Sequence, residues 1–347
     1  MSNTINRSIK VNKHKVKNRI IMPPVVCFNW TDNDGFEIID RADHYGKRAK
    51  GGTGMIIIES SSISKDVRIC DTELGIWKDE HIPQFERIAK SCHDEGAVVI
   101  VQLMNAGKKA LGKTVYSSSP VEIENKECLE MPIQMIEKVK KDHVAAALRA
   151  KKAGLDGIEI HGAHGYLLSQ LTSKEVNKRT DSYGGSLDNR LRLSLEIVHE
   201  IRQAVGEDFI ICYRLGANDP TMEEDKYFAK KLEEAGVDIL NVSVGIGADS
   251  IVVPEEFKLS AITYMGTVIH QEVNIPVACV FGIREAKEAE YLLENNLIDM
   301  VAVGRGLLAD PDWTNKAIKG EDINKCYHCR TGCKYHIDGR KCPWYNK

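Results

Sequence analysis

Residues 152–170 read KAGLDGIEIHGAHGYLLSQ and place a helix end, a short apolar strand and a polar cluster one after another. Gly154 can end the helix because glycine readily takes the left-handed conformation that such ends need. The apolar run that follows closes on His161, with a second histidine and a tyrosine just beyond it. Residues 234–238 (EAGVD) repeat the same helix end before another apolar run. This repeat predicts consecutive β/α units, in which each helix leads into a buried parallel strand.

Eight apolar runs of this kind occur along the chain, and helical patterns such as residues 137–153 and 190–203 separate them. The runs are continuous rather than alternating, as expected for parallel strands that are buried on both faces. Eight such units predict an α/β fold of the (β/α)8 TIM-barrel type. A doubly wound sheet is the rival, but no Gly-x-Gly-x-x-Gly follows the first run. The predicted strands are residues 19–24, 55–59, 97–102, 157–161, 209–214, 239–243, 276–280 and 300–304.

Composition places the chain among ordinary globular proteins. Its 347 residues are 43% hydrophobic and 28% charged. The formal net charge is −3, so we expect no general positive potential that would attract nucleic acid. No apolar run approaches the roughly 18–20 residues that a membrane helix needs. Residues 1–7 (MSNTINR) lack the apolar centre of a signal peptide. We therefore expect a cytoplasmic protein, whose ten cysteines are thiols or metal ligands rather than disulfides.

Polar residues stand at the carboxyl ends of the predicted strands, where the active sites of such barrels lie. Gly282 follows the seventh strand and Gly304-Arg305 follows the eighth, and phosphate sites of barrels commonly use these two loops. Glycine lets backbone N–H groups approach a phosphate, and an arginine can fork onto its oxygens. Gln102 and Arg214, at the ends of the third and fifth strands, are of the types that would hold the ring of flavin mononucleotide (FMN).

The fourth strand leads into the densest cluster, which consists of His161, His164 and Tyr166. Two histidines can hold an oxyanion, and a nearby tyrosine can deliver a proton. One such residue by itself is more often structural than functional. Polar groups at seven strand ends, however, favour one common site at the barrel mouth.

The segment from His161 to Arg190, with RTDSYGGSLDNR at residues 179–190, resembles the signature of the old yellow enzyme family. The similarity extends from Asn18 to Trp313. It implies that the chain binds FMN and that the positions matching the family's flavin contacts have the same role here. Those positions are Pro23, Pro24, Val25, Val26, Ser60, Gln102, Arg214, Gly282, Gly304 and Arg305.

The same resemblance implies an activity, the reduction of the C=C bond of α,β-unsaturated carbonyl or carboxylate compounds. In the family, the residues that match His161 and His164 bind the oxygen of the activated alkene. The residue that matches Tyr166 donates a proton to one alkene carbon, and flavin N5 delivers hydride to the other. NADH or NADPH would then reduce the flavin again.

The last part of the chain, residues 326–347, is polar, lacks an apolar period and is dense in cysteine. Four thiolates at the spacing found here suit an iron–sulfur cluster or zinc, with His328 and His336 as additional zinc ligands. The run resembles the [4Fe–4S] motif of the dienoyl-CoA reductase and enoate reductase branch of the family, which favours the cluster over zinc. The expected ligands are Cys326, Cys329, Cys333 and Cys342.

We therefore expect two units, an FMN-binding barrel over residues 1–325 and a short cysteine-rich appendage over residues 326–347. The branch with the cluster motif continues into a nucleotide-binding region, whereas this sequence ends at Lys347. The expectation is that a cluster here takes its electrons from an external partner.

The chain departs from many relatives at Asn105 and Lys108, where they have histidine and arginine. Cys27 lies one position beyond the flavin-tuning cysteine of some relatives, so we expect neither flavin tuning nor a covalent flavin link from it. Two other functions stay open: an oxidative enzyme like the related amine dehydrogenases, and a non-catalytic carrier of electrons between a flavin and an iron–sulfur cluster. A homo-oligomer is suggested only by analogy with the family.

Overall fold

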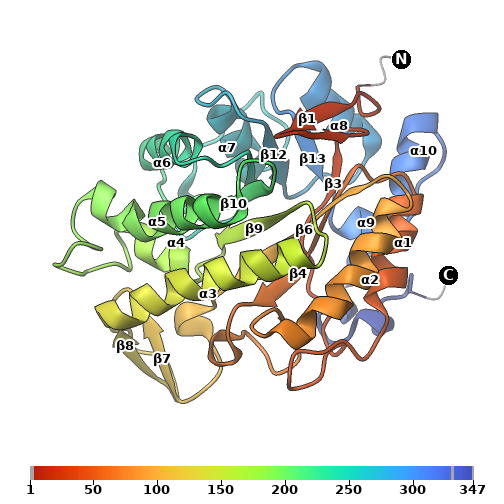
Figure 1. The fold of residues 1–347 in the computed structure, drawn as a ribbon. Helices are drawn as coiled ribbons and strands as arrows, with labels where there is room; N and C mark the ends of the chain where they lie inside the picture. The colour runs from red at the N-terminus through yellow and green to blue at the C-terminus, as the bar shows by residue number, and fades with distance from the viewer. Residues whose placement is uncertain (1–3, 330–331, 346–347) are drawn as a thin grey trace.

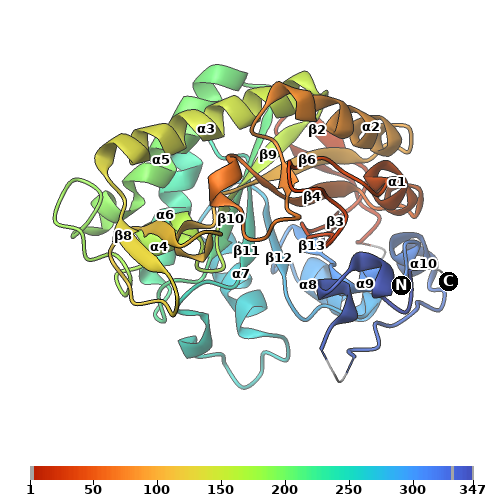
Figure 2. The ribbon, with the colours of Figure 1, turned by 90° about the horizontal axis from the view of Figure 1, so that it is seen from below.

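The computed structural model describes residues 4–329 and 332–345. Its centre is a closed barrel of parallel strands with helices around it (Figure 1, Figure 2). The barrel strands follow the order β3-β13-β12-β11-β10-β9-β6-β4, and β3 pairs with β4 to close the ring. The predicted TIM barrel is confirmed, because each predicted run overlaps one of these strands. They are β3 (Ile20–Met22), β4 (Met55–Ser62), β6 (Val98–Met104), β9 (Gly157–Gly162), β10 (Ile210–Gly216), β11 (Ile239–Ser243), β12 (Val277–Val280) and β13 (Met300–Ala302).

The helix ends that the sequence repeats also connect neighbouring strands. Gly154 and Gly236 have φ angles of 76° and 100°, the left-handed conformation that glycine allows. The Asp156 carboxylate that follows the first turn accepts a 2.7 Å hydrogen bond from the Val99 N–H of the adjacent strand. The Asp238 carboxylate, just before β11, likewise accepts a 2.8 Å hydrogen bond from the Ile211 N–H of the adjacent strand β10. Each turn therefore ends a helix and fixes the start of a strand.

Helices cover the outside of the barrel (Figure 2). Within the described residues, no helix is long and apolar enough to cross a membrane. The helices are α1 (Arg41–Lys50), α2 (Ile82–His93), α3 (Ile133–Lys152), α4 (Leu167–Thr172), α5 (Leu187–Val205), α6 (Glu223–Glu234), α7 (Ala261–His270), α8 (Ala286–Glu294), α9 (Arg305–Ala309) and α10 (Trp313–Lys319).

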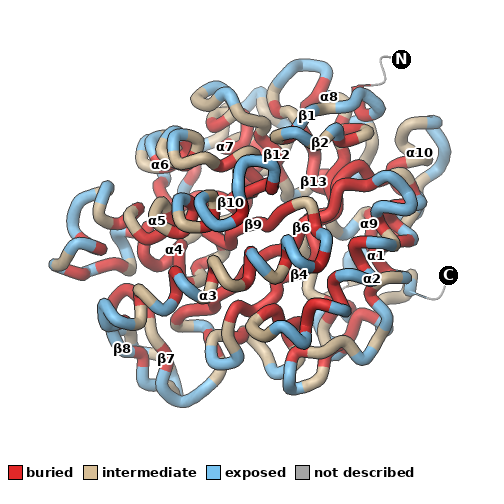
Figure 3. The backbone as a smooth tube through the Cα atoms, viewed as in Figure 1, coloured by how far each residue is buried: buried red, intermediate tan, exposed pale blue. Residues whose placement is uncertain are grey.

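The interior of the barrel has an apolar floor below a polar mouth. Ile57, Ile100 and Met300 lie in the floor and have no exposed surface. An antiparallel hairpin of β1 (Ile9–Val11) and β2 (His14–Val16) adds two valines to the same cluster. The strands are mostly buried, whereas the outer loops and helix faces are exposed (Figure 3). The sequence analysis did not predict this hairpin or the short strands β5 (Leu74–Gly75), β7 (Thr114–Ser117) and β8 (Glu127–Glu130).

Residues 326–329 and 332–345, called the tail below, are fixed to the barrel through Tyr335. This side chain is only 3% exposed, and its hydroxyl lies 3.1 Å from the Cys27 Sγ atom. The Asn29 side-chain amide donates a 2.6 Å hydrogen bond to the carbonyl oxygen of Ile337. The tail thus packs on the segment between β3 and α1.

Candidate active site

A buried carboxylate, Glu159, lies at the centre of the polar mouth. It accepts hydrogen bonds from Gln102 Nε2 at 2.7 Å and from Asn241 Nδ2 at 2.8 Å. Arg214 Nη1 forms an ion pair with it at 4.0 Å. An ionised carboxylate can only accept hydrogen bonds, so the Gln102 amide turns its nitrogen toward Glu159. Its amide oxygen is then left for a ligand above.

Arg214 carries buried donor atoms that point to a missing partner. Its side chain is 4% exposed, and its Nε and Nη1 atoms have no hydrogen-bond partner among the described residues. Burial lowers the pKa of Arg214, and the Glu159 charge opposes this effect. Burial likewise raises the pKa of Glu159, against the effect of Arg214. Buried donors without acceptors are costly, so these N–H groups suit a polar ligand in the mouth.

A cavity of about 580 Å³ opens beside Arg214. This volume lies within the usual range of cofactor sites, roughly 300–1,000 Å³. Of the predicted cofactor-binding residues, Val26, Ser60 and Gln102 are not among those that line it, although Gln102 reaches its arginine through Glu159. The predicted residues that do line it are Pro23, Pro24, Val25, Arg214, Gly282, Gly304 and Arg305.

Part of the wall of this cavity is formed by unusual backbone. Phe281 has a φ angle of 101°, which is strained for a non-glycine residue, and Gly282 follows at 86°. The hydroxyls of Ser260 and Thr263 donate to the Phe281 carbonyl oxygen at 3.0 and 3.1 Å. These bonds hold the strained peptide in place and direct the glycine toward the cavity. Local strain that neighbours enforce is typical of ligand sites.

His161 and His164 form a hydrogen-bonded pair at the mouth. The Nε2 atom of His161 lies 3.1 Å from Nδ1 of His164, whose φ angle of 58° turns it back toward β9. Its Nε2 atom lies 2.8 Å from the Ser243 Oγ atom. Burial lowers the pKa of His161 well below its usual value, and it lowers the pKa of His164 to about 3. Both rings are therefore neutral at neutral pH and act as hydrogen-bonding groups rather than cations.

Tyr166 lies against this pair. Its ring centroid is 4.9 Å from that of His161. Lys109 Nζ lies 5.0 Å from the centroid of the tyrosine ring and donates a 2.7 Å hydrogen bond to the His164 carbonyl oxygen. Burial, aided by the charge of Glu73, raises the pKa of Tyr166 to about 12. The phenol therefore holds its proton until a stronger base forms beside it.

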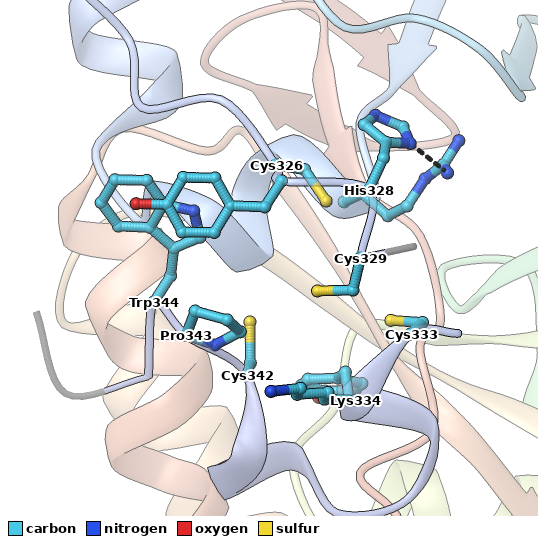
Figure 4. Close-up of a pocket in the computed structure, with 11 residues that line it drawn as sticks. Cys326, His328, Cys329, Cys333, Lys334, Cys342, Pro343 and Trp344 are labelled. Carbon is cyan, nitrogen blue, oxygen red and sulfur yellow. Dashed lines mark hydrogen bonds between the residues drawn. The ribbon is translucent and has the colours of Figure 1, made fainter. Parts of the chain in front are cut away.

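The four cysteines of the tail surround a second cavity of about 220 Å³. Figure 4 shows their Sγ atoms turned toward a common space. Among the described residues, no group of three or more His, Cys, Asp or Glu side chains is arranged so that it could hold a metal ion. Arg305, Cys326, His328 and Cys333 line both this cavity and the larger one, and Arg305 Nη1 lies 3.1 Å from His328 Nδ1. The tail therefore forms part of the wall of the larger cavity.

Comparison with known proteins gives the family. The sequence profile of the NADH:flavin oxidoreductase / NADH oxidase family matches residues 5–324. The chain belongs to this family. It is 33% identical over 329 residues to an NADPH dehydrogenase of Bacillus subtilis (strain 168), covering 92% of this chain and 95% of that protein. The resemblance to old yellow enzymes is thereby confirmed.

Two longer members are also similar to the chain. An NADH oxidase of Thermoanaerobacter brockii is 39% identical over 345 residues, which are 94% of this chain and 52% of that protein. The structure of a 2-naphthoyl-CoA reductase in complex with 2-naphthoyl-CoA superposes with a TM-score of 0.89 at 26% identity. The superposition covers 100% of this chain and 58% of the 2-naphthoyl-CoA reductase chain. The chain thus spans about half the length of the first and somewhat more of the second.

Several residues of the mouth were missed by the sequence analysis. Glu159 gave a signal, because a charge in the middle of an apolar strand demands buried partners. No sequence signal indicated a role in the site for Asn241, Ser243 or Glu73. Ser60, a predicted cofactor contact, does not line the cavity, and its hydroxyl donates to Glu73 Oε1 at 2.9 Å. Cys27 is buried, and its Sγ atom lies 3.1 Å from the Tyr335 hydroxyl.

Glu73 predicts a pH-dependent stability. Burial raises the pKa of its carboxyl from 4.5 to about 8, so the native state holds this proton longer than the unfolded chain. The free energy of unfolding must then fall as pH rises from about 4.5 to about 8, by roughly 4 kcal/mol from this group. In Glu73→Gln that loss should disappear. Urea unfolding at pH 5 and pH 9 measures it, and an equal pH difference in both proteins would contradict the assignment.

Proposed function

We propose that the protein is an FMN-dependent NAD(P)H oxidoreductase that reduces the C=C bond of α,β-unsaturated carbonyl or carboxylate compounds. The observation that carries the proposal is the neutral pair of His161 and His164 with the Tyr166 ring 4.9 Å from the first histidine. These groups lie next to the cavity that Arg214 lines, because Ser243 contacts both His164 and Arg214.

The residues present fit FMN. The Nε and Nη1 donors of Arg214, which have no hydrogen-bond partner among the described residues, suit the polar edge of the flavin ring. The Gln102 side chain, whose nitrogen is held by Glu159, would offer its oxygen to a ring N–H. Gly282, Gly304 and Arg305 suit the phosphate at the other end of the cavity. When bound, FMN would take up electrons from NAD(P)H and supply hydride to the alkene.

The protein's own groups would activate the alkene and supply its proton. N–H groups of His161 and His164 would bind the carbonyl oxygen, which makes the β-carbon electrophilic. Tyr166 would give its hydroxyl proton to the α-carbon as negative charge develops there. Its raised pKa keeps that proton in place in the resting site. Burial of the site would exclude water from both steps.

We also propose that Cys326, Cys329, Cys333 and Cys342 hold a [4Fe–4S] cluster. Their thiols face one cavity of about 220 Å³. Four thiolates around one space suit such a cluster. Four thiolates also suit zinc, which stays the alternative. Residues 326–347 would then be a cofactor-binding segment beside the barrel of residues 1–325.

Anaerobic purification with a visible spectrum and turnover of 2-cyclohexenone tests this function. The expected result is a flavin spectrum with added broad absorbance, and enone-dependent oxidation of NADH or NADPH. A flavoprotein that NAD(P)H reduces but no enone reoxidises would point to the electron carrier instead. Flavin reduction by a tertiary amine without NAD(P)H would point to the oxidative alternative.

A further inference from the structure

The hydrogen bonds around His164 have only one consistent set of directions. The backbone N–H of Ala163 donates to His161 Nδ1 at 3.2 Å, so this nitrogen is an acceptor and the ring proton of the neutral His161 lies on Nε2. That N–H donates to His164 Nδ1 at 3.1 Å. The proton of His164 is therefore on Nε2, where it meets the Ser243 oxygen at 2.8 Å.

Ser243 lies where these bonds meet the cofactor cavity. It ends β11, next to β10 in the barrel, and its side chain is buried. Arg214 Nη2 donates to the same hydroxyl oxygen at 3.1 Å, and an arginine can only donate. Ser243 Oγ thus accepts two hydrogen bonds in this state, and its own O–H is not used in either of them.

This arrangement uses up the donors that a substrate would need. The His161 N–H donates to His164, and the His164 N–H donates to Ser243, so neither is left to donate to a substrate. For both rings to donate to one carbonyl oxygen, His164 must carry its proton on Nδ1. Its Nε2 then becomes an acceptor and requires a donor at the position of Ser243. A hydroxyl is suited to this change, because it can accept in one state and donate in the other.

We propose that Ser243 is a positioning residue that lets His164 switch its protonated nitrogen when a carbonyl oxygen binds. This inference rests on the proposed function. In the empty site, Ser243 accepts from Nε2–H of His164. In the bound site, it donates its O–H to the same nitrogen, while His161 Nε2–H and His164 Nδ1–H both face the carbonyl oxygen. The proton count is unchanged, with one ring proton on His164 and one hydroxyl proton on Ser243 in each state. The ring proton exchanges through water at the mouth.

The bond to Arg214 persists through the switch, because Ser243 Oγ can accept from Nη2 whichever way its own proton points. The flavin-side arginine and the substrate-side histidine therefore share one oxygen atom. Loss of the hydroxyl removes this shared hydrogen-bond partner of His164 and Arg214.

The test is the tautomer of His164 in enzyme with 15N-labelled histidine, followed by NMR of the oxidised holoenzyme with and without 2-cyclohexenone. The expected tautomer is Nε2–H in the free enzyme and Nδ1–H with the enone bound. Ser243→Ala should stay Nε2–H and bind the enone about tenfold more weakly or worse, because His164 Nε2 has no donor to meet. Ser243→Thr, which keeps the hydroxyl, should restore the switch and the affinity.

Ser62→Ala is the matched control, because this buried serine also ends a barrel strand but donates to the Ser64 carbonyl oxygen at 2.8 Å. An Nδ1–H tautomer in the free wild-type enzyme, or wild-type enone affinity in Ser243→Ala, would overturn the proposal. Failure of the proposed function looks different. The wild-type flavin would then be reduced by NAD(P)H and not reoxidised by any enone, while the free-enzyme tautomer would still decide whether the directions around Ser243 are right.

Discussion

Tyr166→Phe should lose about 10²- to 10⁴-fold of its rate of enone reduction, the usual contribution of a positioned general acid. The substitution removes one hydroxyl and leaves the ring that packs against His161 at 4.9 Å. Rapid mixing of reduced enzyme with 2-cyclohexenone under anaerobic conditions would isolate the step that needs the proton. The rate of flavin reduction by NAD(P)H should stay within about twofold of wild type, because that step does not use the phenol.

Tyr183→Phe is the control for the loss of a tyrosine hydroxyl. Tyr183 is also buried, but its hydroxyl donates to Glu196 Oε2 at 3.0 Å, away from the residues of the mouth. It should reduce the enone at the wild-type rate. Full activity in Tyr166→Phe would show that another group delivers the proton, and it would leave the role of the histidine pair intact.

Cys329→Ser should abolish the iron content of the protein while the flavin remains. The wild type should contain about four irons per chain if the tail holds one [4Fe–4S] cluster. Cys329 lines the smaller cavity and is not among the residues that line the larger one, so its loss should remove a cluster ligand without disturbing the FMN site. Iron and FMN would be quantified on the same anaerobic sample, together with the broad visible absorbance.

Cys92→Ala controls for the general effect of losing a cysteine. This thiol is buried in α2, and burial raises its pKa to about 12, as expected for an inert core residue. The variant should keep both iron and FMN. If the wild-type protein contained zinc and no iron, the cluster proposal would be contradicted and the tail would be a structural metal site.

Much of the site follows from the sequence because of one property of parallel barrels. The carboxyl ends of all strands meet at one mouth, so locating the strands also locates the side chains that share a site. The strand ends alone predict that one site contains His161, His164, Tyr166 and Arg214. Their chemistry as donors and as a proton source remains a prediction for the kinetics above.

Other residues of the mouth depend on contacts that no local pattern encodes. Glu159 and Asn241 are separated by 82 positions and are joined by one 2.8 Å hydrogen bond. The Cys27 thiol meets Tyr335 across 308 positions. A side chain at such a distance along the chain has no periodicity or spacing that could indicate its partner, so these contacts appear only when the barrel closes.

The sequence by itself determined the barrel, the position of its mouth, the family and the set of residue types gathered there. These follow from strand periodicity, from glycine and aspartate at the helix ends and from short motifs, all of which are local. Only the tertiary structure decided which hydrogen atoms face which acceptors: the turn of Gln102 toward Glu159, the tautomers of the histidine pair and the double use of the Ser243 hydroxyl. The tail likewise became part of the cavity wall only through packing. The physical reason is that a hydrogen bond needs a donor–acceptor distance within a few tenths of an ångström and a nearly straight angle. Such precise placement arises only after distant strands have been brought together.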